Sequence, residues 1–357
     1  MTSEAATIEN WLAAAAAKGA SDLHVVAGHK PTLRLHGRLV DLDAATLSAS
    51  FVRDGLEGLT EPKQLERFKA DKNIDFALQR DFAPGRQRFR ANYFVTGQSI
   101  GACFRVIPSS IPDFDWAGFP HETADRLAHF RNGLVLITGV TGAGKTTTLA
   151  MIINLLNREG GYRIITAEDP IEYVFPTNPN SIVTQREVGQ DIVSFADGLK
   201  YGLRQDPDVI LVGEIRDQET AQMALSAAET GHLVFSTLHT RDAKGAVSRF
   251  TDLFRPATQP EVRAQLSMAL RAVVSQHLLP SAVDDKRQLA LEIMINNNPI
   301  ASAIRMGKLE SIDTGIVTGR ADGMISLDES LRRLHKAGAI TRDTAERFTT
   351  DATILNR

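Results

Sequence analysis

The sequence predicts an α/β protein, in which a small α+β domain precedes a larger domain built on a parallel-type sheet. Up to about residue 110, several short segments alternate apolar and polar residues, which is typical of half-buried strands. From about residue 121, nearly continuous apolar runs alternate with segments of helical spacing, as in a parallel sheet covered on both faces. We expect domains over 1–110 and 121–357, with a linker over 111–120 in the proline-rich stretch 108–120.

The bulk composition narrows the class of protein. The 357 residues are 43% hydrophobic, enough for the cores of two domains, and the formal net charge of -3 gives no general attraction to nucleic acid or anionic lipid. The single cysteine, Cys103, excludes a disulfide framework and a cysteine-rich zinc site within one chain. Because no signal-peptide pattern and no membrane-spanning apolar run is present, we expect a soluble cytoplasmic protein.

The first domain is predicted to begin with a helix and to end with strands. In order, we expect a helix over 7–18, strands in DLHVVAG (22–28) and TLRLHGRLVDL (32–42), helices over 46–58 and 61–70, and three antiparallel strands in NIDFALQ, RQRFRANYF and GACFRVIP.

The second domain is predicted to alternate buried strands with helices. The expected strands are LVLIT, RIITAE, DVILVGE and LVFSTLH, and the helices between them cover 145–158, 194–204 and 218–230. After His239 the pattern is mostly helical, with helices over 260–279, 299–308 and 326–337 and one further strand over 289–295.

A phosphate-binding loop follows the first of these strands. The segment from Gly139 to Thr146 fits G-x-x-x-x-G-K-[ST] between a strand and a helix, which is the context this motif requires. Its glycines allow the backbone N–H groups to point at phosphates, Lys145 would reach the β- and γ-phosphates, and the hydroxyl of Thr146 would bind Mg²⁺. The alternative is an ordinary glycine-rich turn, but the strand before the motif and the helix after it argue against that alternative. The expected nucleotide-binding residues are Gly139, Thr141, Gly142, Ala143, Gly144, Lys145, Thr146 and Thr147.

Acidic residues end two of the predicted core strands. Glu214 ends DVILVGE, and a glycine precedes it where the usual Mg²⁺-holding Asp would stand. We therefore interpret Glu214 as the base that orients the attacking water and as a metal contact through water. The segment RIITAEDPIE places Glu168 and Asp169 at the end of another predicted strand, which Pro170 stops. Since adjacent carboxylates point to different faces of a strand, we choose Glu168 and keep Glu172 as a weaker candidate.

Two histidines, His232 and His239, flank the strand LVFSTL. A lone histidine is usually structural, but two at the ends of a core strand beside the predicted site favour a functional role about as much as a structural one. That role would be to sense the γ-phosphate or to couple it to a neighbouring domain. Their spacing does not suggest zinc.

With these motifs placed, the chain resembles the secretion and pilus motor ATPases, and within them the twitching-motility retraction group. Four boxes occur in that family's order: GVTGAGKTTT, ITAEDPIE, LRQDPDVILVGEIRD and TGHLVFSTLHT. The resemblance spans nearly the whole chain and implies a PAS-like domain before a RecA-like ATPase core, with ATP and Mg²⁺ as cofactors. It also implies a homo-hexameric ring that is cytoplasmic and peripheral at the inner membrane, where it docks on a pilus platform protein; a paralogous pilus ATPase is an open further partner.

The same resemblance assigns roles to individual residues. Glu168 matches the acidic-box glutamate, Glu214 the catalytic glutamate, and His232 and His239 the histidine-box positions. Arg90 in FRANYF and Arg105 in ACFRVIP match the arginine fingers, which would stabilise charge on the γ-phosphate. Without the family, two arginines on strands would be interpreted as solvated.

Retraction is favoured over extension or secretion by three features of the sequence. The chain starts at the PAS-like domain, lacks the four-cysteine zinc insertion, and has Ala303-Ile304-Arg305 in NPIASAIRMGK, which is similar to a motif of the retraction group. Ala167 in the acidic box and the segment SRFTDLFRPATQP depart from the usual pattern, so an accessory pilus ATPase or a related secretion motor stays open. A monomeric ATP-binding sensor and a nucleic-acid translocase also stay open; no basic stripe supports the latter, and we expect no nucleic-acid partner.

Overall fold

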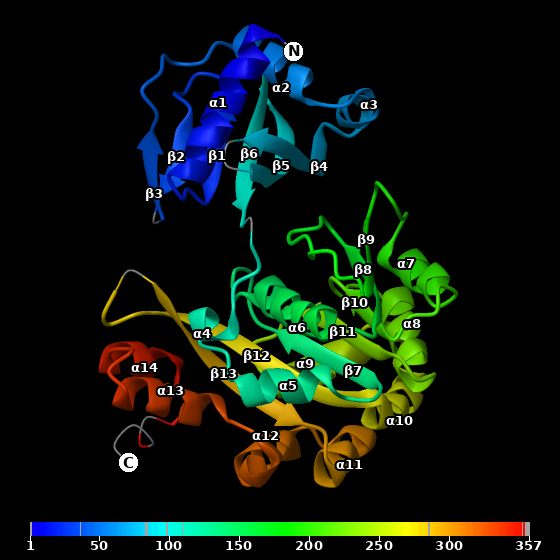
Figure 1. Ribbon diagram of the computed structural model, residues 1–357. Helices are drawn as coiled ribbons and strands as arrows, with labels where there is room; N and C mark the ends of the chain where they lie inside the picture. Colours follow the sequence, from blue (N-terminus) through cyan, green and yellow to red (C-terminus); the bar gives the residue numbers. More distant parts are fainter. Residues whose placement is uncertain are drawn as a thin grey trace. The chain divides into compact units, whose positions relative to one another are not determined.

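The computed structural model describes residues 2–35, 37–82, 85–97, 99–108, 110–284, 286–351 and 353 (Figure 1). The chain divides into two compact units: Met1–Ser110 with Pro170–Tyr173, and Ile111–Asp169 with Val174–Arg357. Among the helices of the described ranges, none is both long and apolar enough to cross a membrane. Each unit has its own sheet.

The first unit is a six-stranded antiparallel sheet in the order β3-β2-β1-β6-β5-β4. Alternate residues of β5, namely Phe89, Ala91 and Tyr93, are buried in a core shared with the helices, and the residues between them lie on the other face. The strands are β1 Asp22–Val26, β2 Thr32–Leu35, β3 Arg38–Asp41, β4 Asn73–Phe82, β5 Gly85–Thr96 and β6 Ser99–Ile107; the helices are α1 Ser3–Ala17, α2 Ala49–Leu59 and α3 Pro62–Asp71. The three helices and the antiparallel trio β4–β6 confirm the prediction.

The segment predicted as one alternating strand over 32–42 is two strands. β2 and β3 pair antiparallel, with Leu35 opposite Arg38, and Gly37 in the turn has a φ of +80°, which glycine adopts at little cost. Apolar–polar alternation continues through a tight turn, so the pattern alone did not show the reversal of the chain.

The second unit is a seven-stranded sheet in the order β13-β12-β7-β11-β10-β8-β9. All neighbours run parallel except β12 and β13, which form an antiparallel hairpin at one edge. The strands are β7 Gly133–Thr138, β8 Arg163–Glu168, β9 Ile182–Glu187, β10 Val209–Val212, β11 Leu233–Leu238, β12 Leu270–Pro280 and β13 Arg287–Ile295. Every residue of β7, β10 and β11 is buried, which is why these strands read as continuous apolar runs.

Helices cover both faces of this sheet (Figure 1). α6, which joins β7 to β8, lies with α5 on one face; α7, α8, α9 and α10 lie on the other, as right-handed crossovers in opposite directions require. These helices are α5 His121–Ala128, α6 Lys145–Glu159, α7 Phe195–Gly202, α8 Gln218–Glu229, α9 Ala243–Asp252 and α10 Gln259–Ala269. A C-terminal helical part follows: α11 Asn298–Met306, α12 Glu310–Thr318, the 3₁₀ turn η1 Gly319–Asp322, α13 Leu327–Lys336 and α14 Arg342–Phe348.

One predicted helix of this unit is wrong, and one strand was missed. The predicted helix over 260–279 ends at Ala269 as α10, and the chain continues directly as β12, which inserts between β7 and β13. A short apolar run fits a buried strand as well as a helix, and here the β-branched pair Val273 and Val274 lies inside the sheet. The half-exposed edge strand β9 was not predicted.

The stretch interpreted as a linker, 111–120, falls within the second unit and contains a one-turn helix, α4 Phe114–Ala117. Asp113 caps this helix by accepting from the N–H of Trp116, and Gly118 ends it at a φ of +67°. The prolines thus occur where the second unit begins, but part of the stretch is helical. Ser109, in the same proline-rich stretch, lies outside the described residues.

Candidate active site

The phosphate loop has the predicted strand–loop–helix geometry. β7 ends at Thr138 and α6 begins at Lys145, with Gly144 as its N-cap at a φ of +86°. Gly139 has a φ of +143°, and a Cβ built there would lie 2.6 Å from the backbone oxygen of Gln276 on β12. Glycine at 139 therefore allows β12 to approach the loop, while glycine at 144 allows the left-handed turn into the helix.

Lys145 is buried at the N-terminus of α6, inside the loop. Its Nζ donates to the carbonyl oxygens of Gly139 at 2.8 Å and Val140 at 3.2 Å. A buried ammonium beside a ring of backbone groups and a helix N-terminus is suited to bind the negative charge of phosphates. The other predicted nucleotide-binding residues surround it: Thr141 and Gly142 are exposed, Ala143 is buried, and Thr146 and Thr147 are half-buried in the first turn of α6.

His239 joins the loop lysine to Glu214. The Nδ1 of His239 lies 3.4 Å from the Nζ of Lys145, and its Nε2 lies 3.0 Å from Oε2 of Glu214. Burial, and after it the positive charges of Lys145 and Arg216, lower the pKa of His239. The imidazole is therefore neutral at pH 7, with Nε2–H donating to the carboxylate and Nδ1 accepting from the ammonium.

Glu214 follows the end of β10, and its side chain is only 12% exposed. Its second oxygen, Oε1, pairs with the guanidinium of Arg216. The carboxylate is thus held from both sides by His239 and Arg216. Together with the hydroxyl of Thr146, it offers the oxygen donors that Mg²⁺ prefers, so the residues present fit that ion.

Glu168 ends β8 and is buried, whereas Asp169 is exposed, as the alternation of a strand requires. Its carboxylate accepts hydrogen bonds from Oγ1 of Thr166 at 2.6 Å and Nε2 of Gln185 at 3.0 Å. β8 is three strands from β7 in the sheet, or about 14 Å at the usual spacing. β8 also pairs with β10, so Glu168 is distant from the strand that leads to Lys145 but only one strand away from the strand that leads to Glu214.

His232 is not beside the phosphate loop, contrary to the expectation from the sequence. It precedes β11, and its carbonyl accepts from the N–H of Gly133 at the start of β7. The six-residue strand separates it from the loop by about 20 Å. Its Nδ1 instead lies 3.0 Å from the carbonyl of Ala227 and 3.2 Å from the hydroxyl of Thr230, so within this subunit the contacts hold the chain between α8 and β11.

Arg90 and Arg105 lie in the first unit, directly opposite each other on β5 and β6. Both are on the sheet face opposite the helices, and each pairs with a carboxylate: Arg90 with Asp75 at 3.3 Å and Arg105 with Asp22 at 3.1 Å. The side chain of Arg105 is 59% exposed, so its pair is only weakly stabilising and can be exchanged for a stronger anion.

A family model described as "Type II/IV secretion system protein" matches residues 4–326. The chain belongs to this family. It is 40% identical over 338 residues to the type IV pilus retractation ATPase PilT of Pseudomonas aeruginosa. The aligned part covers 95% of this chain and 96% of that protein. The chain is 36% identical over 328 residues to the type IV pilus ATPase PilU of the same organism, covering 92% and 85%.

Among solved structures, the chain matches the pilus retraction motor PilT with bound ADP at a TM-score of 0.86 and 40% identity, covering 97% of this chain and 98% of that one. These similarities confirm the predicted α/β class and the predicted resemblance. The chain is an ATP-binding ATPase of the secretion family.

Several residues of this secretion ATPase that surround the loop were missed in the sequence, because they lie on the β12–β13 hairpin. Oγ1 of Thr138 donates to Oγ of Ser275 at 2.9 Å, and Nε2 of Gln276 donates to Oγ1 of Thr148 at 2.8 Å. Nη1 of Arg287 donates to the carbonyl of Gly142 at 3.3 Å. The β-branched pair Val273 and Val274, within the predicted helix over 260–279, was the feature of the sequence that could have indicated a strand there. Arg216 was also missed, although it stands two residues after Glu214 in the same box.

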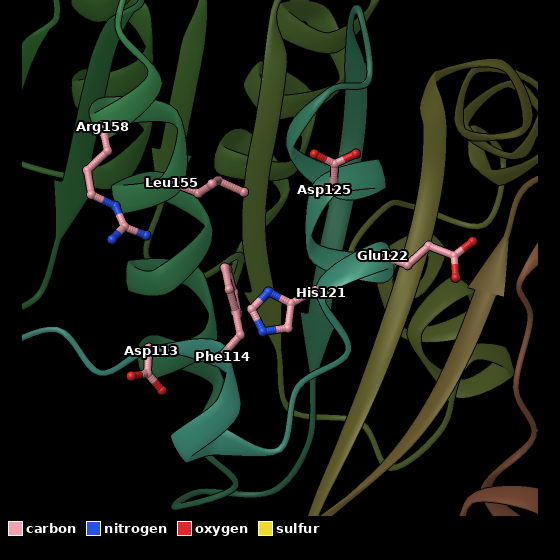
Figure 2. A pocket seen from close by; sticks show the side chains of 7 residues that line it. All are labelled: Asp113, Phe114, His121, Glu122, Asp125, Leu155 and Arg158. Atoms are coloured by element: carbon pink, nitrogen blue, oxygen red, sulfur yellow. The ribbon is translucent and has the colours of Figure 1, made fainter.

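A separate pocket of about 550 Å³ lies among α4, α5 and the C-terminal part of α6 (Figure 2). Figure 2 shows Phe114 beside the imidazole of His121, and the ring centroids are 5.5 Å apart. Its lining includes Leu155, ten residues after Lys145 and hence about 15 Å along α6. The pocket is therefore distinct from the nucleotide site of this secretion ATPase.

Close to that pocket, Asp125, His129 and Glu159 bring their ligand atoms within 4.8 Å of one another. All three are exposed, and Nε2 of His129 lies 2.9 Å from Oε2 of Glu159. The hydrogen bond that His129 donates to Glu159 raises the pKa of His129, which favours a protonated histidine and an ion pair over a metal ligand.

Proposed function

We propose that this secretion-family ATPase is the motor that retracts a type IV pilus, working as a homo-hexameric ring at the cytoplasmic face of the inner membrane. The contact from Lys145 through His239 to Glu214 supports the hydrolytic part, because it links a phosphate-binding cation to a buried carboxylate. The pilus part is supported by the 40% identity to a retraction ATPase over almost the whole of both chains.

The residues of the site divide the work of hydrolysis. The loop N–H groups and Lys145 hold the β- and γ-phosphates, and Glu214 accepts the proton of the attacking water. His239, which donates to Glu214, keeps that carboxylate oriented. Thr146, and Glu214 through water, would hold Mg²⁺, which neutralises developing phosphate charge when bound. Glu168 adds a second acidic group at the same edge of the sheet.

The homo-hexamer matters for hydrolysis because of Arg90 and Arg105. We propose that these arginines complete the nucleotide site of a neighbouring subunit, where their guanidinium groups stabilise the γ-phosphate charge. Each now pairs with an Asp at more than 3.0 Å, and a phosphate of higher charge would compete for it.

Mixing two inactive variants tests this arrangement. Arg90→Ala subunits keep an intact phosphate loop, and Lys145→Ala subunits keep intact arginines. In mixed rings some intact loops lie beside intact arginines, so ATP turnover should partly return. Turnover that stays absent, although mixed rings are seen by mass measurement, would contradict the trans arrangement.

The retraction role is tested in the organism that encodes the chain, with fluorescently labelled pili. Deleting the gene should abolish pilus retraction and leave cells with more surface pili; the wild-type gene should restore retraction and the Lys145→Ala gene should not. Retraction that continues at the normal frequency in the deletion strain would overturn this role.

An accessory role is the second candidate, favoured by the 36% identity to PilU. Loss of an accessory ATPase should leave unloaded retraction intact and reduce only retraction under load, which an optical-trap measurement distinguishes. In either role, we propose that the ring docks on a membrane platform protein. Crosslinking tests this docking. The crosslinker is placed at Arg305 on α11, which belongs to the motif similar to the retraction group.

A further inference from the structure

The backbone that follows His239 is held at two successive points by the β12–β13 hairpin. Nε2–H of His277 on β12 donates to the carbonyl of Arg241 at 2.9 Å. The N–H of Ala243 donates to Oε1 of Glu292 on β13 at 2.7 Å. These two groups flank Asp242, the N-cap of α9, so one side chain holds each side of the helix start.

Both side chains come from one face of the hairpin. Ser275 pairs with Glu292 and His277 with Ala290, and in an antiparallel pair alternate residues share a face. Ala243 is completely buried, so its N–H has no water to replace a lost acceptor. The start of α9 therefore depends on Glu292 for its position.

His239 is four residues before Ala243, and its ring reaches both Lys145 and Glu214. A hydrogen bond tolerates only a few tenths of an ångström before it weakens. Any shift of the chain at Ala243 would thus reach the imidazole through the three residues between them.

We propose that Glu292 is a positioning residue for ATP hydrolysis: by fixing the first turn of α9, it keeps His239 between Lys145 and Glu214. The inference rests on the ATPase activity and on the role proposed above for His239. Glu292 holds the N–H of Ala243, so it acts through the segment 240–243.

The surroundings of Glu292 make its hydrogen bond with the N–H of Ala243 depend on pH. Burial is the main cause that raises the pKa of Glu292 to about 7; Asp242 on α9, Asp313 on α12 and Asp328 on α13 act in the same direction, and the Ala243 N–H opposes them. The nearby Lys244 is engaged with Glu310 and Asp313. The neutral histidine His277 adds no charge, since burial lowers its pKa.

Near neutral pH, Glu292 is thus present both as a carboxylate and as a carboxylic acid. The carboxylate accepts a charge-assisted hydrogen bond and is favoured by the N-terminus of α9, so it holds the helix more firmly than the neutral form. Turnover should therefore rise as pH increases through 7.

The test compares wild type with Glu292→Gln, which keeps an acceptor oxygen but cannot ionise. The ratio of their ATP turnover numbers should rise from about one at pH 6 to about fivefold at pH 8.5, since a charge-assisted hydrogen bond is about twice as strong as a neutral one. The KM for ATP should be equal in the two proteins. The matched control is Glu346→Gln, an exposed carboxylate on α14 that pairs with Arg342 of its own helix; it should leave the ratio near one throughout.

A second variant moves the titration itself. Asp242→Asn keeps a good N-cap and removes a negative charge beside Glu292, so in that background the midpoint of the ratio should shift to lower pH. A turnover ratio independent of pH, or a changed KM with loss of thermal stability at every pH, would overturn the positioning role. His239→Ala separates the two hypotheses: if it retains full turnover, the proposed role of His239 fails, whereas a flat ratio with an inactive His239→Ala refutes only Glu292.

Discussion

Replacing Glu214 with glutamine should separate ATP binding from ATP hydrolysis. The amide of Glu214→Gln would keep the shape of the side chain and could still accept from Nε2–H of His239, but it cannot take a proton from water. Loss of a positioned general base costs a factor of about 10² to 10⁴ in rate. We expect turnover to fall by at least about a hundredfold.

The structure also predicts that folding and binding survive this change. The main loss is the ion pair with Arg216, whose side chain is 68% exposed and remains hydrated without its partner. Such a loss costs at most about 1 kcal/mol, well below the stability of a typical domain. The hydrogen bonds that hold Lys145 to Gly139 and Val140 do not involve Glu214, so the affinity for ATP should change less than about threefold.

The assay measures ATP affinity by equilibrium binding and turnover by phosphate release. Glu219→Gln is the matched control, because it makes the same chemical change on an exposed residue in the first turn of α8. It should turn over ATP like the wild type. Glu214→Gln with turnover within tenfold of wild type, or an equal loss in the control, would show that the base is another group.

Three further variants test the loop and the stability of the domain. Lys145→Ala should reduce ATP turnover to background with an unchanged circular dichroism spectrum. Gly139→Ala should lower the free energy of unfolding by about 1–3 kcal/mol, because its Cβ would meet a backbone oxygen at 2.6 Å, and by more than Gly142→Ala, where nothing lies within 4 Å. Since Glu159 raises the pKa of His129, their pair stabilises the fold below pH 6.5 and loses that effect as pH rises through the raised pKa. Glu159→Gln should weaken this pH dependence of the melting temperature, an effect below about 1 kcal/mol, and leave the smaller part that is due to Asp125.

The sequence predicted best those parts of the site where local backbone chemistry demands particular residues. The phosphate loop needs glycines at fixed offsets and a lysine at the helix start, and the structure has Gly139, Gly144 and Lys145 in those roles. The position of Glu214 was also predicted from local pattern, because a carboxylate just after a fully buried strand lies where the loops of a parallel sheet gather, and the structure has it within 3.0 Å of His239.

Contacts between distant segments were not predictable in the same way. His232 and His239 have similar local contexts at the two ends of β11, yet only His239 reaches Lys145. Which end of a strand faces the site depends on strand direction in the sheet, and the loop after β7 and the residue before β11 are at opposite edges. From the sequence alone, both histidines therefore had equal weight.

The wrong helix over 260–279 shows why such contacts matter for function. As a strand, this segment places Ser275 and Gln276 on opposite faces, so that one bonds Thr138 before the loop and the other bonds Thr148 after it. A helix there would leave these buried hydroxyl groups unpaired and would remove the carbonyl that Gly139 packs against. The hairpin therefore braces the phosphate loop from both sides, and through His277 and Glu292 it also holds the start of α9. The loop motif specifies a backbone and a lysine suited to phosphate, whereas β12 and β13 determine where the loop lies relative to His239 and Glu214.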